Sequence, residues 1–167
     1  MSRAFVKEHD GDAPDDGLPE SRLSSGPNYV TPKGLSDLQA RLASAQSEVD
    51  ALRVADGKGA AKSALARARA EMRRLQRRID AAVLVDTDAS ADGEIALGMR
   101  ATIEYPDGKR ATFTIVGEDE ADPQSGLVSW TSPLGAALLG KREGDVALWL
   151  RPAGNVEVKI IAASART

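Results

Sequence analysis

The chain has no cysteine and only one histidine, His9, among its 167 residues. Without cysteine it can form no disulfide and no thiolate metal site, and one histidine supports neither a histidine-ligated zinc nor a Ser-His-Asp triad. Aromatic residues are also scarce, at 4% of the chain. These absences exclude most hydrolase chemistry, and we expect neither a bound metal nor a cofactor.

Long apolar runs are missing as well. No segment reaches the roughly 18 consecutive apolar residues that a membrane span needs. The N-terminal sequence MSRAFVKE also lacks the apolar core of a signal peptide. We therefore expect a cytoplasmic protein with no membrane contact.

The net charge of −3 hides a segregation of charge along the chain. Residues 1–27 carry three basic and six acidic side chains, residues 28–85 carry eleven and six, and residues 86–167 carry eight and thirteen. The middle segment is therefore basic, at +5, and the last segment is acidic, at −5. Long-range fields would orient such a polarised molecule as it approaches a charged partner.

Two leucine-rich series with helical spacing predict an antiparallel helical hairpin. In each series apolar residues recur at steps of three and four, which is the spacing of a coiled-coil seam. Between the series, Gly57 and Gly59 can take positive φ at no steric cost, so the chain can reverse there. Thr31-Pro32 supplies an N-cap and a first-turn proline for the first arm. The seam residues are Leu35, Leu38, Leu42, Ala45, Val49 and Leu52 in the first arm, and Leu65, Ala68, Met72, Leu75, Ile79 and Ala82 in the second, which we expect to run to about Leu84.

From Met99 the period changes to the alternation that is typical of strands. A short helix is expected from the cap Ser132-Pro133 to Leu139, closed by Gly140. The pattern predicts five antiparallel strands and one small helix, which together with the hairpin make an α+β fold. The expected strands cover residues 99–105, 110–116, 127–131, 145–150 and 155–161.

The chain thus divides into successive segments, and we expect a monomer because a hairpin that satisfies its own seam needs no partner helix. The expected segments are a disordered acidic tail over residues 1–27, a coiled-coil hairpin over 28–86 with its tip near 54–60, a linker over 87–97, a compact domain over 98–163 and a short tail over 164–167.

The most specific motif is SWTSPLGAALL over residues 129–139, followed four residues later by Gly144-Asp145. It resembles, without a gap, the C-terminal signature of the bacterial Gre transcript-cleavage factors, GreA and GreB, which occupy the secondary channel of RNA polymerase. Residues 115–122, 152–157 and 28–35 are also similar to that family. The resemblance extends over most of the chain outside the N-terminal tail.

The resemblance implies an FKBP-like C-terminal domain that docks on the rim of the channel while the coiled coil points into it. It also implies that the start of the short helix and the apolar side chains beside it contact the polymerase. The alternative is that these side chains only cover the sheet. Carried over to this chain, the implied contact residues are Ser132, Pro133, Ala136 and Leu139, with Asp119 and Asp122 as neighbours.

The expected tip departs from the family pattern. Cleavage factors carry a pair of acids there that help to hold a second Mg²⁺ for phosphoryl transfer. Over residues 54–64 this chain has one acid, Asp56, beside Lys58 and Lys62. Residues 31–86 also make a hairpin shorter than we expect of a cleavage factor, by about two turns of about 5.4 Å in each arm. The sequence therefore predicts a channel-binding transcription regulator that is not an enzyme and does not stimulate cleavage.

Three alternatives stay open at this point. The chain could be an active transcript-cleavage factor, an FKBP-like isomerase or chaperone, or a direct nucleic-acid binder. The last is suggested by arginines on the second arm, since phosphate contacts come mainly from Arg and Lys. No aromatic residue interleaves them for base stacking, so we expect nucleic-acid contact only within a polymerase complex. These arginines are Arg67, Arg69, Arg73, Arg74, Arg77 and Arg78.

Overall fold

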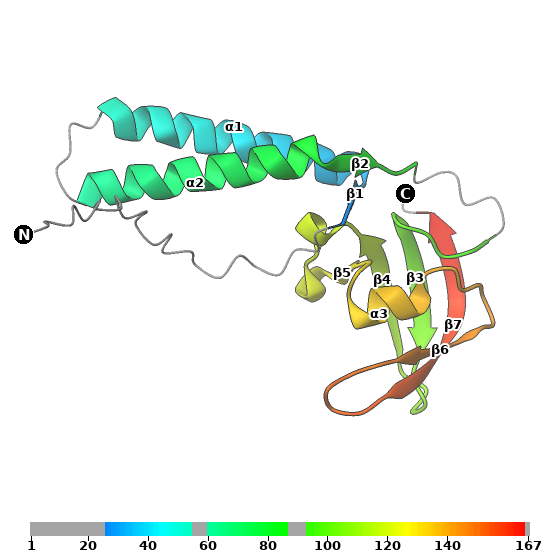
Figure 1. The fold of residues 1–167 in the computed structure, drawn as a ribbon. Coiled ribbons are helices and arrows are strands. Elements are labelled where there is room, and N and C mark those ends of the chain that lie inside the picture. The colour runs from blue at the N-terminus through cyan, green and yellow to red at the C-terminus, as the bar shows by residue number, and fades with distance from the viewer. Residues whose placement is uncertain (1–25, 55–59, 87–92, 166–167) are drawn as a thin grey trace, which may run out of the picture.

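The computed structural model describes residues 26–54, 60–86 and 93–165. In this part of the chain a helical hairpin rests on a small domain built around a five-stranded sheet (Figure 1). The predicted α+β class is confirmed. The predicted tail and linker lie partly outside the described residues, and the predicted tip lies almost wholly outside them.

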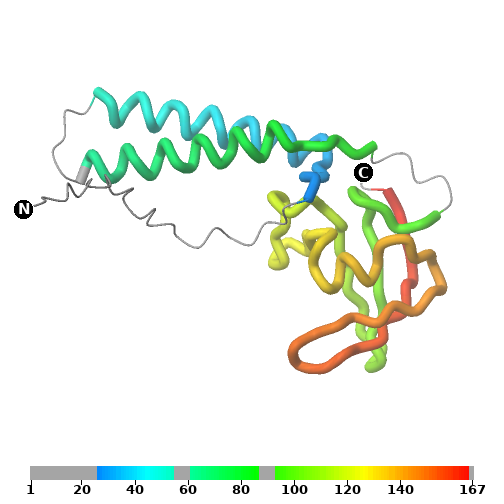
Figure 2. Tube along the Cα trace, viewed as in Figure 1, coloured from blue at the N-terminus to red at the C-terminus, as the bar shows by residue number. Residues whose placement is uncertain are grey.

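The hairpin consists of α1, Pro32–Val54, and α2, Ala60–Asp80, which run side by side in opposite directions (Figure 2). The predicted start of α1 is confirmed, because the Gly34 backbone N–H donates to Thr31 Oγ1 at 3.0 Å. All twelve predicted seam residues are buried or half-buried, and Leu38 and Leu75 are only 1% exposed. Burial of this stripe is the main source of stability for such a hairpin. No described helix combines the length and the apolar composition that crossing a membrane requires.

Two short parallel strands close the base of the hairpin. β1, Asn28–Val30, precedes α1, and β2, Ala82–Leu84, follows α2. The expectation that the second helix continues to about Leu84 is therefore wrong. The backbone leaves the helix after Asp80 because it pairs with β1 instead, and the Val85 N–H donates to the Val30 carbonyl at 3.0 Å.

The sheet is mixed, which corrects the expectation of a wholly antiparallel one. β4 and β5 pair in parallel, and the other neighbours are antiparallel. Parallel pairing requires a crossover, and two 3-10 turns, η1 Glu118–Glu120 and η2 Pro123–Ser125, provide it here. The strand order is β5-β4-β3-β7-β6, with β3 Met99–Glu104, β4 Arg110–Val116, β5 Leu127–Ser129, β6 Val146–Trp149 and β7 Val156–Ala165.

One face of the sheet carries the core of the domain. The helix α3, Pro133–Leu138, buries Leu134 and Leu138 among apolar residues of the strands. The opposite face carries polar side chains on β3 and β4, with the Arg110 guanidinium 2.8 Å from the Glu104 carboxylate, and exposed Val146 and Leu148 on β6. Helix α3 therefore lies on the covered side of the sheet, with one flank against the core and the other toward solvent.

Candidate functional site

The helix α3 begins with an ordered cap. Ser132 Oγ accepts from the Gly135 backbone N–H at 3.0 Å and donates to the Ser129 carbonyl at 2.7 Å, while Pro133 occupies the first helical position. A Cβ at Gly135 would overlap the backbone of Ser129, so glycine allows the helix to pack directly against the end of β5. These contacts hold the start of α3 in one place.

Four of the six predicted contact residues lie together on this helix. Pro133 and Ala136 are exposed, and Ser132 and Leu139 are half-buried. Because Leu134 and Leu138 take up the side that faces the sheet, Pro133 and Ala136 are left on the solvent side, beside Ser132 and beside Leu139, which packs partly against the core. We call Ser132, Pro133, Ala136 and Leu139 the docking surface.

Asp119 does not belong to that surface. Its carboxylate Oδ2 lies 2.8 Å from Arg78 Nε on α2, and its side chain is only 5% exposed. The carboxylate faces the base of the hairpin and is paired there, so the contact of Asp119 with a polymerase stays a prediction. The ion pair joins residues 41 positions apart in the chain.

Asp122 is exposed and caps the short turn η2. Its carboxylate accepts from the Gln124 backbone N–H at 3.1 Å and from Ser125 Oγ at 2.5 Å. The Ser125 hydroxyl, and then the backbone N–H groups, hold the pKa of Asp122 below its usual value. Asp122 is thus ionised at neutral pH and open to solvent.

The predicted tip residues are described only in part. Lys62 is exposed in the first turn of α2, whereas Asp56 and Lys58 lie outside the described residues. Among the residues that the structure describes, no cluster of three or more His, Cys, Asp or Glu side chains could hold a metal ion. One carboxylate near two lysines is a poor match to the paired acids that a second Mg²⁺ would require.

Sequence reasoning missed the contacts that join the hairpin to the sheet domain. Glu120 accepts from the backbone N–H and hydroxyl of Thr31, and Arg78 pairs with Glu118 and Asp119. The only signal in the sequence was an acidic run downstream of a basic one, and nothing in it indicates which acid meets which base.

The described residues thus form a helical hairpin on a mixed-sheet domain, with the capped helix α3 at the surface of that domain. A family model described as "Transcription elongation factor, GreA/GreB, C-term" matches residues 90–165. Transcription elongation factor GreA of Chloroflexus aurantiacus is 33% identical, covering 84% of this chain and 90% of that protein. GreA of Geobacillus kaustophilus is 40% identical, covering 62% and 66%. The chain therefore belongs to the GreA/GreB family of bacterial transcription elongation factors.

Solved structures are also similar to this chain. The crystal structure of GreA factor homolog 1 (Gfh1) of Thermus thermophilus is 28% identical, covering 84% of this chain and all of that chain, with a TM-score of 0.40.

The relatives correct one expectation. The sequence predicted a protein that is not an enzyme, but the curated relatives are named transcription elongation factor GreA, and factors of that kind stimulate cleavage of the RNA transcript. The prediction gave the composition of the tip too much weight against similarity along most of the chain.

Proposed function

We propose that this elongation factor binds core RNA polymerase at its secondary channel, with the docking surface of α3 against the rim and the hairpin pointing into the channel. Factors of the GreA type act with RNA polymerase in general. The hairpin over residues 28–86 and the domain over residues 98–163 are the two working parts of this proposal.

The observation that carries the proposal is that α3 is already held in a fixed position in the free protein. The cap by Ser132 and the close approach at Gly135 fix the helix before any partner arrives. Exposed Pro133 and Ala136 can then be buried against a partner with little loss of conformational entropy, because neither side chain has rotamer freedom to lose.

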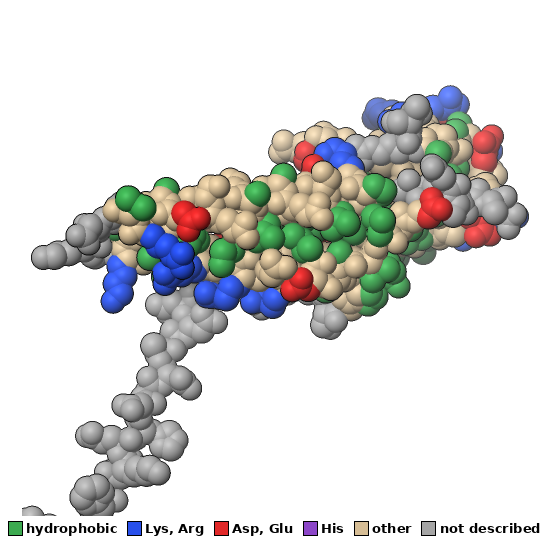
Figure 3. Space-filling view, turned by 90° about the horizontal axis from the view of Figure 1, so that it is seen from above, with side chains coloured by type: hydrophobic (Ala, Val, Ile, Leu, Met, Phe, Trp, Pro, Cys, Tyr) green, Lys and Arg blue, Asp and Glu red, His purple; other side chains and the backbone are tan. Residues whose placement is uncertain are grey.

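The shape and charge of the hairpin support its entry into a channel. At about 1.5 Å per residue, α1 is about 35 Å long. Basic side chains gather along one edge of the hairpin toward its free end (Figure 3), and exposed Lys62, Arg67 and Arg73 belong to α2. We propose that they face acidic groups or nucleic acid within the polymerase complex, and that the factor acts as a cytoplasmic monomer.

The tip bears on how strongly the factor stimulates cleavage. Asp56 is the only acid over residues 54–64, and Lys58 and Lys62 lie nearby in the sequence. We propose that cleavage is stimulated more weakly than by a factor with paired acids. Occupation of the channel, which keeps out other molecules, then becomes the larger part of its action.

A charge placed on the docking surface tests the proposal. Ala136→Glu should weaken binding to core polymerase by about tenfold or more, because a buried unpaired carboxylate costs more than about 1.4 kcal/mol. Ala162→Glu is the matched control, since Ala162 is an exposed alanine of β7 in the same domain. Affinities measured by fluorescence anisotropy with purified core enzyme would decide. Equal affinities for the two variants would overturn the docking assignment.

A further inference from the structure

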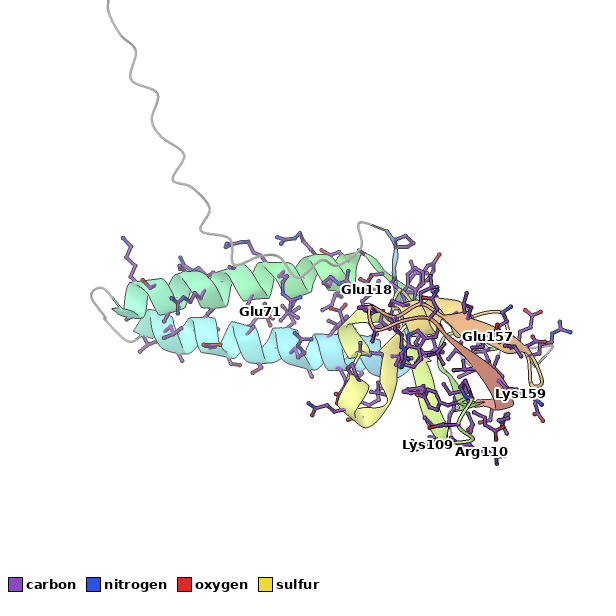
Figure 4. All side chains as sticks on the ribbon, turned by 90° about the horizontal axis from the view of Figure 1, so that it is seen from below. Glu71, Lys109, Arg110, Glu118, Glu157 and Lys159 are labelled. Atoms are coloured by element: carbon purple, nitrogen blue, oxygen red, sulfur yellow. The ribbon has the colours of Figure 1, made fainter. Side chains whose placement is uncertain are left out.

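Three consecutive acids in η1 contact the base of the hairpin, at the start of α1 and at the end of α2. We call Glu118, Asp119 and Glu120 the acidic turn. Figure 4 shows Glu118 at the junction between the hairpin and the sheet domain. Because the acidic turn belongs to the sheet domain and its partners belong to the hairpin, its contacts determine how the two parts are joined.

The end of α2 is held by two of the three acids. Arg78 Nε lies 2.8 Å from Asp119 Oδ2, and Arg78 Nη2 lies 3.3 Å from Glu118 Oε2. The three side chains are 11%, 5% and 9% exposed, in the order Arg78, Asp119 and Glu118. At this depth, removal of one partner leaves a charge buried without compensation, so these contacts are hard to break singly.

The start of α1 is held by the third acid. Glu120 accepts from the Thr31 backbone N–H at 3.1 Å and from Thr31 Oγ1 at 2.6 Å. Thr31 Oγ1 in turn accepts from the Gly34 N–H at 3.0 Å. The N-cap of α1 is thus completed by a carboxylate of the other domain, where a negative charge also interacts favourably with the helix dipole.

Asn28 connects the two halves of this network. Its amide nitrogen donates to the Arg78 carbonyl at 2.9 Å and to Asp119 Oδ2 at 3.3 Å, while its amide oxygen accepts from Arg78 Nη2 at 2.5 Å. Asn28 is 2% exposed. The neighbouring Tyr29 ring meets Trp130 edge-on, with the ring centroids 5.4 Å apart. These directional, buried contacts leave little angular freedom.

Two glycines allow the hairpin and the sheet domain to approach each other closely. A Cβ at Gly34 would overlap the Glu120 carboxylate, and one at Gly117 would lie 2.6 Å from the Tyr29 carbonyl oxygen. A pocket of about 490 Å³ between α1 and the sheet domain begins at this contact, with Gly34 and Glu120 in its lining, and extends along α1 to Arg41. The hydrogen bonds between α1 and the acidic turn are therefore made at the base of the hairpin.

We propose that the acidic turn fixes the direction in which the hairpin leaves the sheet domain, and that Arg78 and Glu120 are positioning residues for the action of the factor. The functional half of this inference rests on the proposed binding at the channel. Over a helix of about 35 Å, a change of about 10° at the base moves the free end by about 6 Å. A misplacement of that size is enough to remove most of an effect that depends on the position of the tip.

Gly34→Ala is the sharpest variant. Helix propensity alone predicts that it stabilises α1, because alanine is the better helix former. The inference predicts that the variant nevertheless disturbs the contact between α1 and the sheet domain, since the new methyl group displaces Glu120. Ser36→Ala, an exposed position two residues further along α1, is the matched control. Arg78→Ala removes the partner of Glu118 and Asp119 in the other half of the network, and the same change of angle is expected.

The angle can be measured in the free, full-length protein. The natural chain has no cysteine, so spin labels can be placed through Ala43→Cys on α1 and Lys159→Cys on β7, both exposed positions. Double electron–electron resonance should give one narrow distance distribution in the parent and in Ser36→Ala, and a broad or shifted one in Gly34→Ala. A distribution in Gly34→Ala that matches the parent would overturn the inference, whatever the polymerase does.

Assays with polymerase then test the positioning role. Gly34→Ala should keep the affinity for core polymerase and lose about tenfold or more of its effect on transcription at saturation. If the hairpin angle shifts in Gly34→Ala while the effect on transcription is unchanged, the positioning role of the acidic turn is refuted. If the parent does not bind polymerase at all, the proposed function fails, and the distance distributions still decide whether the acidic turn sets the angle.

Discussion

A single hydroxyl, that of Ser132, links the fold of the sheet domain to its docking surface. Its loss in Ser132→Ala leaves the Gly135 N–H without its cap acceptor and removes one of the two hydrogen bonds that the Ser129 carbonyl accepts from Ser132. We expect the free energy of unfolding to fall by about 1 kcal/mol, the usual cost of losing an N-cap. Urea unfolding followed by tryptophan fluorescence measures this domain selectively, because Trp130 and Trp149 are the only tryptophans of the chain.

The control for this variant is Ser164→Ala, an exposed serine of β7. Surface substitutions of this kind usually change stability by less than about 0.5 kcal/mol. Equal losses of unfolding free energy in the two variants would show that the cap hydrogen bonds contribute nothing measurable to stability.

The cap at Ser132 could be predicted from the sequence because its rule acts within four residues. Asp119 could not, because its partner Arg78 lies 41 positions away and no local pattern pairs them. The sequence places Asp119 in a short acidic loop, where exposure to solvent is expected. In the fold, its carboxylate is buried against the guanidinium of Arg78. At this scale, predictions hold where the partner is a neighbour in the chain.

Among the elements, the two long helices were the most predictable, because an apolar seam repeated over many residues leaves one good periodic solution. β1 and β2 were missed because each is three residues long and pairs with a strand more than 50 positions away in the chain. The parallel pairing of β4 and β5 was missed for a related reason. It depends on how the chain crosses through η1 and η2, and strand periodicity does not encode that path.

An ion pair between the helices is expected to make the stability of the hairpin depend on pH. Glu71 on α2 accepts from Arg74 at 2.7 and 2.8 Å and lies 3.5 Å from Arg41 on α1. The hydrogen bonds from Arg74, with the charges of Arg74 and Arg41, hold the pKa of Glu71 below its ordinary 4.5. A lowered folded-state pKa stabilises the fold above the unfolded-state value, and that contribution is lost as pH falls through the folded-state value.

Glu71→Gln should therefore lower the stability of the hairpin at neutral pH by about 0.5 kcal/mol, since solvent screens a pair this exposed. The difference from the parent should shrink as the pH falls below 4.5. Urea unfolding followed by helical circular dichroism over a pH series measures it. Glu48→Gln, at an exposed position of α1 outside the pair, controls for the loss of one charge. A pH-independent difference would contradict the electrostatic origin.

For the whole molecule, the two working parts and the charge carried by each could be predicted from the sequence, but the geometry between them could not. That geometry depends on Asn28, Thr31 and Arg78 meeting the acidic turn, and these segments are distant in the chain. Family membership followed from similarity along the chain. In our proposal the strength of cleavage depends on a few residues at the tip, and overall similarity says little about so few positions.

The tip composition leads to a prediction about activity. Lys58→Glu replaces a cation by a second acid beside Asp56 and so brings the tip closer to the paired acids of cleavage factors. We expect RNA cleavage in backtracked elongation complexes to speed up by about tenfold or more, equivalent to about 1.4 kcal/mol in the barrier. Lys62→Glu makes the same change of charge within α2, farther from Asp56 in the sequence. If both variants accelerate cleavage equally, net charge explains the gain. If neither does while both still bind polymerase, the reach of the short hairpin limits cleavage, and not the number of acids at its end.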